Sequence, residues 1–401
     1  MSGVLSDLKV VAFTHYAAGP LTAQFIGALG AEVIKIEAPT QDLNRYAVRD
    51  HDGRFGGVSP YFVTLNRNQR TIALDLKSDI GKDIAQRLIE NSDLVIENYR
   101  PGVLDRLGFG YEQLKAKKPS LIYCSISGYD LLGPSRDAPG QDLIIQALSG
   151  ITMLTGSSGS NPVPVGTYAV DAYTSMQCVA GILAAVRHRD RTGTGQWVRA
   201  DMMSSAIHMM AQEASYALNV DPVFTRSSSG VAHVHQAAPY AIYKTADGAI
   251  AISITPADKV SVMAKKFGVF DKISEFISDR GLLEHRDEIV AALATSIGSY
   301  STEEALAMVS EAGAICAPVR NLAQALADPA IVASGLLRET ESAYGGRYKV
   351  VAEPLHLSET PLEFGRPAPA FGEQSREILL ELGFDLDAIE KLIDSRIVLE
   401  S

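Results

Sequence analysis

LKVVAFTHYAAGPLTAQFIGALGAEVIKIE, residues 8–37, is the stretch that decides the fold class of this 401-residue chain. Residues 8–13 are mostly apolar and predict a short buried strand. Residues 19–30 follow with a proline in the first turn and a glycine just past the end, which is the usual punctuation of a helix. Residues 31–37 predict a second strand. This order predicts a β-α-β unit, whose two strands run parallel.

The same alternation continues through the first third of the chain. Residues 71–76, 93–99 and 121–127 predict further strands. Residues 78–92 predict an amphipathic helix with Ser78 as its N-cap, and the segment between the last two strands is also helical. Near-continuous apolar strands separated by helices are typical of a parallel sheet covered on both faces. The sequence therefore predicts the α/β class.

The length of the chain favours two domains. A turn-rich segment at 221–230 is the candidate linker, and beyond it Asp247 and Gly248 form the turn of a predicted hairpin that is followed by helices. The expected division is a large domain that begins with residues 1–222, a small α+β domain at 223–324, and a return to the large domain at 325–401.

The balance of charges excludes one class of partner. The chain has 36 basic and 47 acidic residues, a net charge of −11, and no basic stripe, whereas nucleic-acid-binding surfaces are basic. The three cysteines are widely separated, which is typical of buried thiols in a reducing compartment. We find no leader pattern and no run of about 18 apolar residues. We therefore expect a cytoplasmic chain that binds neither nucleic acid nor membrane.

No motif points to a metal or to a nucleotide by itself. His233 and His235 have His-x-His spacing, but the sequence places no further ligand beside them, so we expect no metal. The glycine-rich and nucleophile-elbow motifs are absent. A parallel sheet alone does not imply a nucleotide.

Cations follow several of the predicted strands. Lys77 comes directly after residues 71–76, and Arg100 and Arg106 come after residues 93–99. Loops at the carboxyl ends of parallel strands converge on one ligand site, and three cations there would suit a phosphorylated ligand. Ordinary solvated surface is the alternative, and spacing alone leaves both open.

Asp171, in VGTYAVDAYTSM (165–176), is the only charged residue between Asp142 and Arg187. It stands where a polar loop gives way to a long apolar segment, for which we predict a helix over 173–189. As an N-cap it would stabilise that helix by about 1 kcal/mol. As a nucleophile it would use the same helix terminus, which favours negative charge. The residues alone leave both roles open.

Several stretches together resemble the family III CoA-transferases, also called CaiB/BaiF, which include the formyl-CoA and carnitine CoA-transferase group and are related to alpha-methylacyl-CoA racemase. These stretches are GPLTAQFIGALGAEVIKIEAP, LNRNQRTIALDLKS, DLVIENYRPGVLDRLGFGYE, LIYCSISGYD, GQDLIIQALSGITMLTG and RTGTGQWVRADMM. The resemblance implies a Rossmann-like large domain with a parallel sheet, a smaller α+β domain and an interlocked homodimer. It also implies that acyl-CoA and a small carboxylic acid are the substrates and that no cofactor is tightly bound.

The resemblance assigns roles to particular residues. It implies that Asp171 is the catalytic nucleophile, which forms an anhydride and then a thioester with CoA. It implies that Gln141 and Asp142 orient the thioester. The residues implied to bind CoA are Ala17, Ala18, Leu74, Lys77, Asn98, Tyr99, Arg100 and Arg106.

The sequence departs from the formyl-CoA branch at two positions. Ala17 stands where that branch carries a glutamine, so an oxalate-type acceptor is not expected. Ala38 stands where that branch carries an arginine that helps to hold the nucleotide part of CoA, so that contact with CoA is not expected either. Our interpretation is a dicarboxylate or hydroxy acid such as succinate. Candidates to face the acyl group are His15, Arg45, His233 and His235.

Two other functions remain as alternatives. A racemase of the same fold needs a second acid–base group, and the racemase branch has a histidine where this chain has Gln141, whose amide cannot act as a base. A non-catalytic acyl-CoA binding protein, with Asp171 as a helix cap, is the second alternative.

Overall fold

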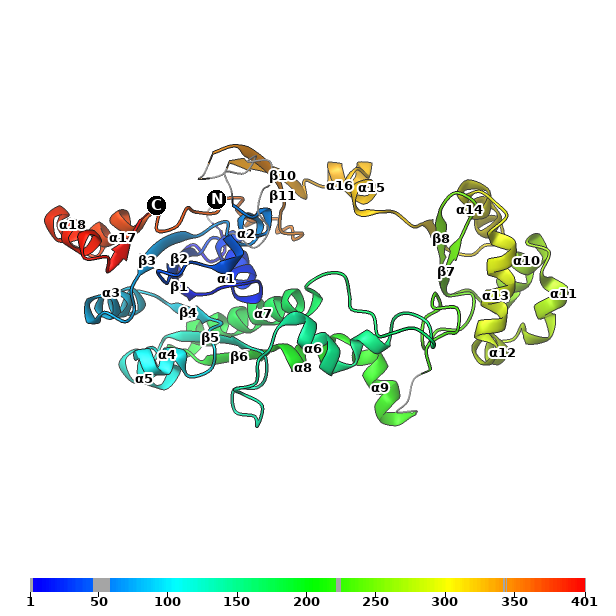
Figure 1. Ribbon diagram of the computed structural model, residues 1–401, viewed down its shortest axis with the longest axis horizontal. Helices are drawn as coiled ribbons and strands as arrows, with labels where there is room; N and C mark the ends of the chain where they lie inside the picture. The colour runs from blue at the N-terminus through cyan, green and yellow to red at the C-terminus, as the bar shows by residue number, and fades with distance from the viewer. Residues whose placement is uncertain (1–2, 46–57, 221–224, 342, 344, 401) are drawn as a thin grey trace. The chain divides into compact units, whose positions relative to one another are not determined.

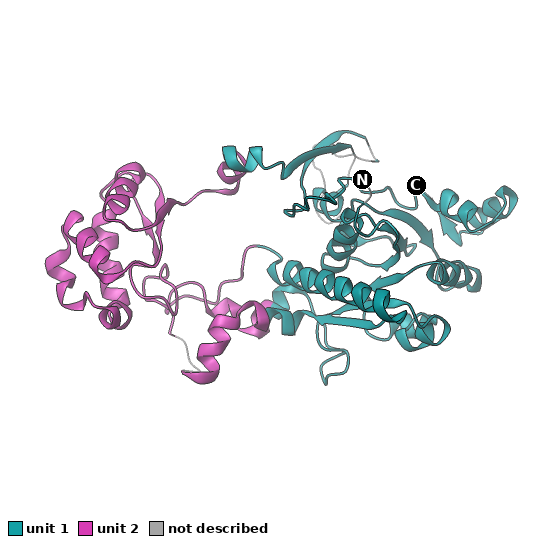
Figure 2. Ribbon diagram, turned by 180° about the vertical axis from the view of Figure 1, so that it is seen from behind, with its two compact units in different colours: residues 1–145, 167–206, 329–401 teal, residues 146–166, 207–328 magenta. Residues whose placement is uncertain are grey.

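The computed structural model describes residues 3–45, 58–220, 225–341, 343 and 345–400. Its contacts divide the chain into two compact units. Unit 1 consists of residues 1–145, 167–206 and 329–401, and unit 2 consists of residues 146–166 and 207–328 (Figure 2). Each unit has a hydrophobic core of its own.

Unit 1 is built on a seven-stranded sheet. In chain order its strands are β1 (Lys9–Phe13), β2 (Glu32–Glu37), β3 (Arg70–Leu74), β4 (Leu94–Glu97), β5 (Ile122–Ser127), β6 (Trp197–Asp201) and β12 (Val398–Leu399). In space the order is β12-β3-β2-β1-β4-β5-β6 (Figure 1). All neighbouring pairs are parallel except β12 and β3. The predicted parallel sheet is confirmed, and its six parallel strands have the order of dinucleotide-binding sheets.

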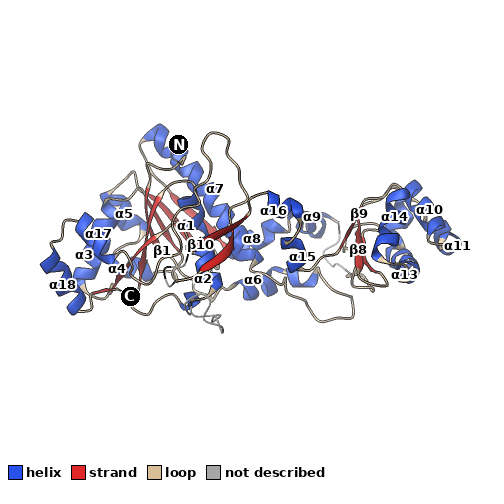
Figure 3. Cartoon of the chain, turned by 90° about the horizontal axis from the view of Figure 1, so that it is seen from above, coloured by secondary structure: helices blue, strands red, loops and turns tan. Residues whose placement is uncertain are grey.

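Helices cover both faces of this sheet (Figure 3). One face carries α3 (Asp79–Glu90), α4 (Val103–Leu107), α5 (Tyr111–Lys117), α17 (Ser375–Glu381) and α18 (Leu386–Asp394). The other face carries α1 (Ala18–Ala28) and α7 (Ala169–Thr192). In β1, Val11 and Phe13 pack into the first layer, and Val10 and Ala12 pack into the second. This period of two explains why strands buried on both faces read as continuous apolar runs.

Four further helices and a hairpin belong wholly or partly to the residues of unit 1. They are α2 (Pro60–Leu65), α6 (Asp142–Ser149), α8 (Met202–Met209), α16 (Pro329–Ala333) and the antiparallel pair β10 (Leu337–Glu341) and β11 (Arg347–Val351). The helix α6 and the hairpin were not predicted from the sequence. A short 3₁₀ turn at Leu43–Arg45 completes the unit.

The helix boundaries show which local signals were informative. Ser78 accepts a hydrogen bond from the Gly81 backbone, which confirms the predicted N-cap of α3. The helical segment after β4 is two helices rather than one, because Gly108 adopts a left-handed conformation (φ 92°) that ends α4. The helix predicted over 173–189 is longer at both ends, since α7 begins at Ala169.

The helix α7 is the longest element and packs against α1, β5 and β6. By length and composition alone it could cross a membrane, because an 18-residue window has a mean hydropathy of 1.3. Only 39% of that window is buried within the chain. Core helices of globular proteins meet the same criteria, so the expectation that the chain binds no membrane stays a prediction.

The last residues of the chain complete the sheet of unit 1. The backbone of β12 pairs with β3, and the Ile397 carbonyl accepts a hydrogen bond from the Asp75 backbone (2.8 Å). The Gln374 side chain accepts a hydrogen bond from the Thr71 backbone (2.9 Å) across a sequence separation of 303 residues. An early strand of the sheet is thus covered by the end of the chain.

Unit 2 has a three-stranded antiparallel sheet and a helical layer. Its elements are α9 (Ala211–Asn219), β7 (Ala241–Lys244), β8 (Ala249–Ile252), α10 (Ala257–Lys266), α11 (Phe270–Ile273), α12 (Asp279–Glu284), α13 (Arg286–Ile297), α14 (Thr302–Glu311), β9 (Cys316–Pro318), α15 (Leu322–Leu326) and two 3₁₀ turns, Ile151–Met153 and Ser274–Phe276. The predicted hairpin is present as β7 and β8, and Thr245 and Gly248 are hydrogen-bonded across its turn. The third strand, β9, was not predicted.

The expected domain boundaries at 222/223 and 324/325 stay predictions about independently folding parts. The compact units change at other positions, after residues 206 and 328, and residues 146–166 belong to unit 2. Of the expected linker at 221–230, residues 221–224 lie outside the described residues.

Candidate active site

The carboxyl ends of β1 and β4 meet where the strand order of the sheet reverses. The loops that follow these two strands are joined through Asn98, whose Oδ1 accepts a hydrogen bond from the His15 backbone (2.9 Å). Its Nδ2 donates to the His15 carbonyl (2.8 Å). Gly19 makes this approach possible, because a Cβ there would lie 2.7 Å from the Asn98 side chain. Open α/β sheets bind their ligands at this position.

A cavity of about 340 Å³ opens beside this junction in unit 1. Its lining residues include Thr14, His15, Tyr16, Ala38, Tyr99 and Arg100. The Thr14 side chain is buried, and its hydroxyl has no hydrogen-bond partner among the described residues. Burial lowers the pKa of His15, although the charge of Asp42 opposes this. The wall of the cavity thus contains a histidine whose pKa is lowered by burial and a buried hydroxyl without a hydrogen-bond partner among the described residues.

Asp171 lies in the first turn of α7, and another carboxylate caps that turn. The N-cap residue is Tyr168, which makes no side-chain capping bond. Instead, Oδ1 of Asp142, the first residue of α6, accepts hydrogen bonds from the backbones of Val170 (2.9 Å) and Asp171 (3.0 Å). The interpretation of Asp171 as the N-cap was therefore wrong. The backbone N–H groups in the first turn of α7, which have no partner within the helix, donate to the Asp142 carboxylate instead.

This arrangement makes Asp171 an unusually basic carboxylate. Burial raises the pKa of Asp171 to about 7, and the charge of Asp142 raises it as well. A hydrogen bond from the Ala18 backbone acts in the opposite direction. A carboxyl group that titrates near neutral pH is uncommon on an ordinary surface and is often found at functional sites.

The start of α1 is fixed against the start of α7. Ser175 donates a hydrogen bond from its hydroxyl to the Ala18 carbonyl (2.8 Å) and to the Asp171 carbonyl (2.9 Å). Ala17 and Ala18 are themselves buried. The two alanines therefore stand beside Asp171, and only their backbones can offer polar contacts.

Two tyrosines near Asp171 were missed by sequence reasoning. The rings of Tyr61 and Tyr168 pack edge to face at 5.4 Å. Burial raises the pKa of both tyrosines, and the charge of Asp171 raises each of them further. Tyr168 is three residues before Asp171 and could have been found from that spacing. No local signal in the sequence connects Tyr61 with the site.

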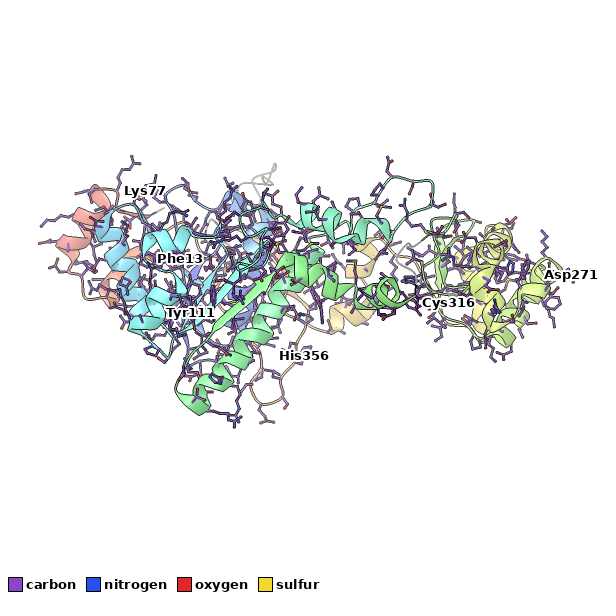
Figure 4. The ribbon with its side chains drawn as sticks, turned by 90° about the horizontal axis from the view of Figure 1, so that it is seen from below. Phe13, Lys77, Tyr111, Asp271, Cys316 and His356 are labelled. Carbon is purple, nitrogen blue, oxygen red and sulfur yellow. The ribbon has the colours of Figure 1, made fainter. Side chains whose placement is uncertain are left out.

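The residues expected to bind CoA are placed differently from one another. Asn98, Tyr99 and Arg100 lie together at the junction of β1 and β4, where Tyr99 is 5.2 Å from the His15 ring. Leu74 is fully buried in the core, so its side chain cannot contact a ligand. The exposed residues of the set are Lys77 (Figure 4), Arg100, Arg106 and Gln141.

The four residues that were candidates for facing the acyl group also lie in different parts of the structure. Arg45 is fully buried, forms an ion pair with Glu37 and lies 4.0 Å from the centre of the Phe62 ring. That arginine is a core residue. His233 and His235 belong to unit 2, whereas His15 lines the cavity of unit 1. Within the described residues, no group of three or more potential ligands could hold a metal ion.

The chain is similar to curated CoA-transferases over almost all of its length. It is 30% identical to an acyl-CoA transferase of Fusarium pseudograminearum, over 99% of this chain and 88% of that protein. It is 30% identical to the succinyl-CoA:glutarate CoA-transferase of Mus musculus, over 98% and 90%. The succinyl-CoA:mesaconate CoA-transferase of Haloarcula marismortui is 31% identical, over 96% and 97%.

The fold is shared with solved structures of the same group. A CAIB/BAIF family protein from Brucella suis superposes with a TM-score of 0.83 at 29% identity, over 95% of this chain and 100% of that chain. Residues 5–375 match the family described as CoA-transferase family III. With this match and these relatives, the chain is an enzyme that belongs to CoA-transferase family III.

Proposed function

We propose that the enzyme transfers CoA from an acyl-CoA donor to a free dicarboxylic acid, with Asp171 as the nucleophile. The observation that carries this proposal is the partly buried Asp171 carboxylate at the start of α7, beside the Ala18 backbone N–H, where burial raises its pKa to about 7. Relatives named for succinate, glutarate and mesaconate support a dicarboxylate. Hydroxy acids are a second acceptor class, since one relative is named for citramalate.

The proposed exchange passes through two kinds of covalent intermediate on Asp171. A carboxylate oxygen attacks the thioester carbonyl, the carbon–sulfur bond breaks, and CoA thiolate leaves a mixed anhydride. The thiolate then attacks the Asp171 carbonyl, which releases the donor acid and leaves an aspartyl-CoA thioester. The acceptor carboxylate attacks the carbonyl of this thioester, which forms a second mixed anhydride with Asp171 and frees the CoA thiolate again. The thiolate then attacks the acceptor carbonyl of that anhydride, which forms the new acyl-CoA and restores the Asp171 carboxylate.

The surroundings of Asp171 suit a group that is alternately charged and neutral. Burial and the Asp142 charge make the neutral acyl forms less costly relative to the free carboxylate. The N-terminus of α7 and the Ala18 N–H favour negative charge that develops on oxygen. The hydroxyls of Tyr61 and Tyr168 are further candidate donors for that charge.

The proposed path of CoA follows the loops after β1, β3 and β4. Arg100, in the lining of the cavity, and the exposed Lys77 and Arg106 would meet the phosphate groups. Asn98 would act by fixing the loop at His15, and Leu74 by its backbone. Asp142 would act by accepting hydrogen bonds from the first turn of α7, which fixes the position of Asp171.

A trapping experiment tests the nucleophile directly. The enzyme is incubated with succinyl-CoA and quenched with hydroxylamine or borohydride, and its peptides are analysed by mass spectrometry. We expect a hydroxamate or an alcohol at Asp171. A racemase or a non-catalytic binding protein would give no modified Asp171.

Turnover of variants gives a second readout. Asp171→Ala should lose CoA exchange by at least about a thousandfold, because the covalent path is removed. Asp385→Ala is the matched control, since Asp385 caps α18 through the Ala388 backbone (2.8 Å) and should cost only about 1 kcal/mol of stability. Exchange by Asp171→Ala within tenfold of the parent would contradict the assignment.

The proposed assembly is an interlocked homodimer, as in the expectation from sequence. Its support is the outer face of α7, where Met176 and Leu183 are 36% and 37% exposed and Ala180 and Ala184 lie between and beside them. A second copy would cover this apolar face. Sedimentation from micromolar to nanomolar concentration should show a dimer throughout, with dissociation only on unfolding. A folded monomer at nanomolar concentration would contradict interlocking.

A further inference from the structure

A second cavity lies in unit 1 beside the hairpin of β10 and β11, and its wall shares no residue with the candidate active site. Its volume is about 360 Å³, and segments 334–338 and 352–364 form its wall. We call it the hairpin cavity. Small-molecule sites have volumes of about 300–1,000 Å³, so only a small ligand would fit. Most of the wall is apolar and consists of Leu336, Leu355, Leu357, Leu362, Phe364 and two prolines.

The wall of the hairpin cavity also carries a positive charge without a counter-ion. Arg338 is exposed, and its Nε donates a hydrogen bond to the Gly335 carbonyl (3.0 Å). Among the residues that the structure describes, no carboxylate pairs with Arg338. Glu353, which also lines the cavity, is already used, because its Oε1 accepts hydrogen bonds from Gln24 (2.6 Å) and Arg67 (2.9 Å). The guanidinium of Arg338 is therefore available to an anionic group.

A second arginine lies behind this wall and is only partly satisfied. Arg67 is 1% exposed, and its Nη2 donates to Glu353 and to the Val351 carbonyl (3.2 Å). Its Nε and Nη1 have no hydrogen-bond partner within the described part of the chain. The guanidinium groups of Arg67 and Arg338 lie 4.9 and 5.6 Å from the centre of the Phe364 ring. Buried N–H groups without an acceptor are uncommon, so the surroundings of this ring favour negative charge.

The short helix α2 packs against the wall of the hairpin cavity. Phe62 and Val63 of α2 form a hydrophobic cluster with Tyr348 and Val350 of β11, and Phe364 of the cavity wall packs against this cluster. Figure 1 shows α2 beside the hairpin. A ligand that displaces Phe364 would therefore disturb the packing of α2.

The same helix reaches the surroundings of the proposed nucleophile. Tyr61 of α2 packs edge to face on Tyr168 (5.4 Å), in the residue before α7. The charge of Asp171 raises the pKa of both tyrosines, which places Asp171 near each of them. Chains of packed side chains can couple two sites, and α2 provides such a chain between the hairpin cavity and Asp171.

We propose that the hairpin cavity is an effector site for a carboxylic acid with an apolar chain, and that α2 links its occupation to Asp171. The carboxylate pairs with Arg338, and the chain lies on the apolar side chains of the wall. A dicarboxylate would have to bury its second charge against that wall without a partner, which is costly. The effector therefore differs in chemistry from the proposed acceptor, and this site is separate from the proposed catalytic function.

The binding test compares hexanoate with hexan-1-ol, which has the same chain length and no charge. Affinities are measured by calorimetry for the parent and its variants. Arg347→Ala is the matched control, because Arg347 belongs to the same hairpin, is 74% exposed and pairs with Glu341 (3.5 Å). The parent should bind hexanoate at least about tenfold more tightly than hexan-1-ol, the factor expected for hydrogen bonds to a charged group.

Arg338→Ala should reduce this ratio to within about threefold and leave the affinity for hexan-1-ol unchanged. Arg338→Lys should lie between the parent and Arg338→Ala, since it keeps the charge and loses the fork. Arg347→Ala should retain the parent ratio. The inference is wrong if the parent does not prefer hexanoate, or if Arg338→Ala keeps the preference.

Turnover tests the link through α2. CoA exchange from succinyl-CoA to glutarate is measured with both substrates saturating. Hexanoate should change the kcat of the parent by at least about twofold, the low end of couplings through packed networks. Arg338→Ala should have the parent kcat without hexanoate and should not respond to it.

Two results of the turnover test would overturn the inference. An equal effect of hexanoate on the parent and on Arg338→Ala would mean that it acts at the catalytic site. A kcat that does not change when hexanoate is bound through Arg338 would contradict the link through α2. The binding test needs no turnover, so a failure of the proposed function would leave its result intact.

Discussion

Replacing Asp171 by asparagine should stabilise the folded enzyme at pH 8 and much less at pH 4.5. Burial raises the pKa of Asp171 from 3.8 to about 7 in the folded state. Between these values the folded protein binds one more proton than the unfolded chain, so its stability falls as pH rises and then levels above pH 7. Asparagine cannot ionise, and its carbonyl can still accept the Ala18 hydrogen bond. The variant should therefore lack this fall in stability.

The size of the effect follows from the two pKa values. At about 1.36 kcal/mol for each pKa unit, a rise from 3.8 to about 7 corresponds to a loss of about 4 kcal/mol when the group is fully ionised. Asp171 is only partly buried, and solvent screening reduces the loss to about 2 kcal/mol. The gain from Asp171→Asn at pH 8 should thus exceed its gain at pH 4.5 by at least about 1 kcal/mol.

Urea denaturation at several pH values measures this difference. Asp271→Asn is the control, because Asp271 is an exposed carboxylate of unit 2 (Figure 4), and it should show no such pH-dependent gain. The reasoning fails if Asp171→Asn is no more stable than the parent at pH 8, or if its gain does not change between pH 4.5 and 8.

Three further outcomes are expected. The rate constant kcat/KM should rise through about pH 7 as Asp171 ionises, and Asp142→Asn, which keeps an acceptor for α7 but removes a charge, should move that rise to lower pH. A pH profile unchanged by Asp142→Asn would contradict the electrostatic link. Lys77→Ala should raise the KM for the acyl-CoA by about tenfold, as expected for one charge-assisted contact, with little change in the KM for the free acid; the reverse pattern would mean that Lys77 serves the acid. Leu183→Glu, on the outer face of α7, should abolish the soluble dimer in sedimentation, and a fully dimeric, active variant would count against the proposed interface.

The sheet could be predicted from the sequence because its signals are local. Strands buried on both faces leave continuous apolar runs, and helix punctuation such as Ser78 is read within a few residues. The short strands β9 and β12 were not predicted, because two or three residues are too few to show an alternation of apolar and polar side chains. The hairpin of β10 and β11 was missed too, because β10 is partly or fully exposed along its whole length and shows no alternation of apolar and polar residues.

The site could be predicted only in part because its contacts are distant along the chain. Asp171 stood out by being the sole charge in an apolar region. Its partner in the helix cap, Asp142, is 29 residues upstream, and Tyr61 is farther still. Leu74 shows a different limit, since a resemblance transfers the position of a residue without telling whether its backbone or its side chain would meet the ligand, and the side chain of Leu74 is buried in the core.

The closure of the sheet by β12 has a consequence for synthesis of the chain. The contact between Thr71 and Gln374 spans 303 residues, which a ribosome adds in roughly 15–60 s at about 5–20 residues per second. During that time β3 is an unprotected sheet edge, open to pairing with other nascent chains. The interval between the emergence of β3 and the arrival of α17 and β12 is therefore when a chaperone would be most useful, and slowing translation there would favour aggregation over folding.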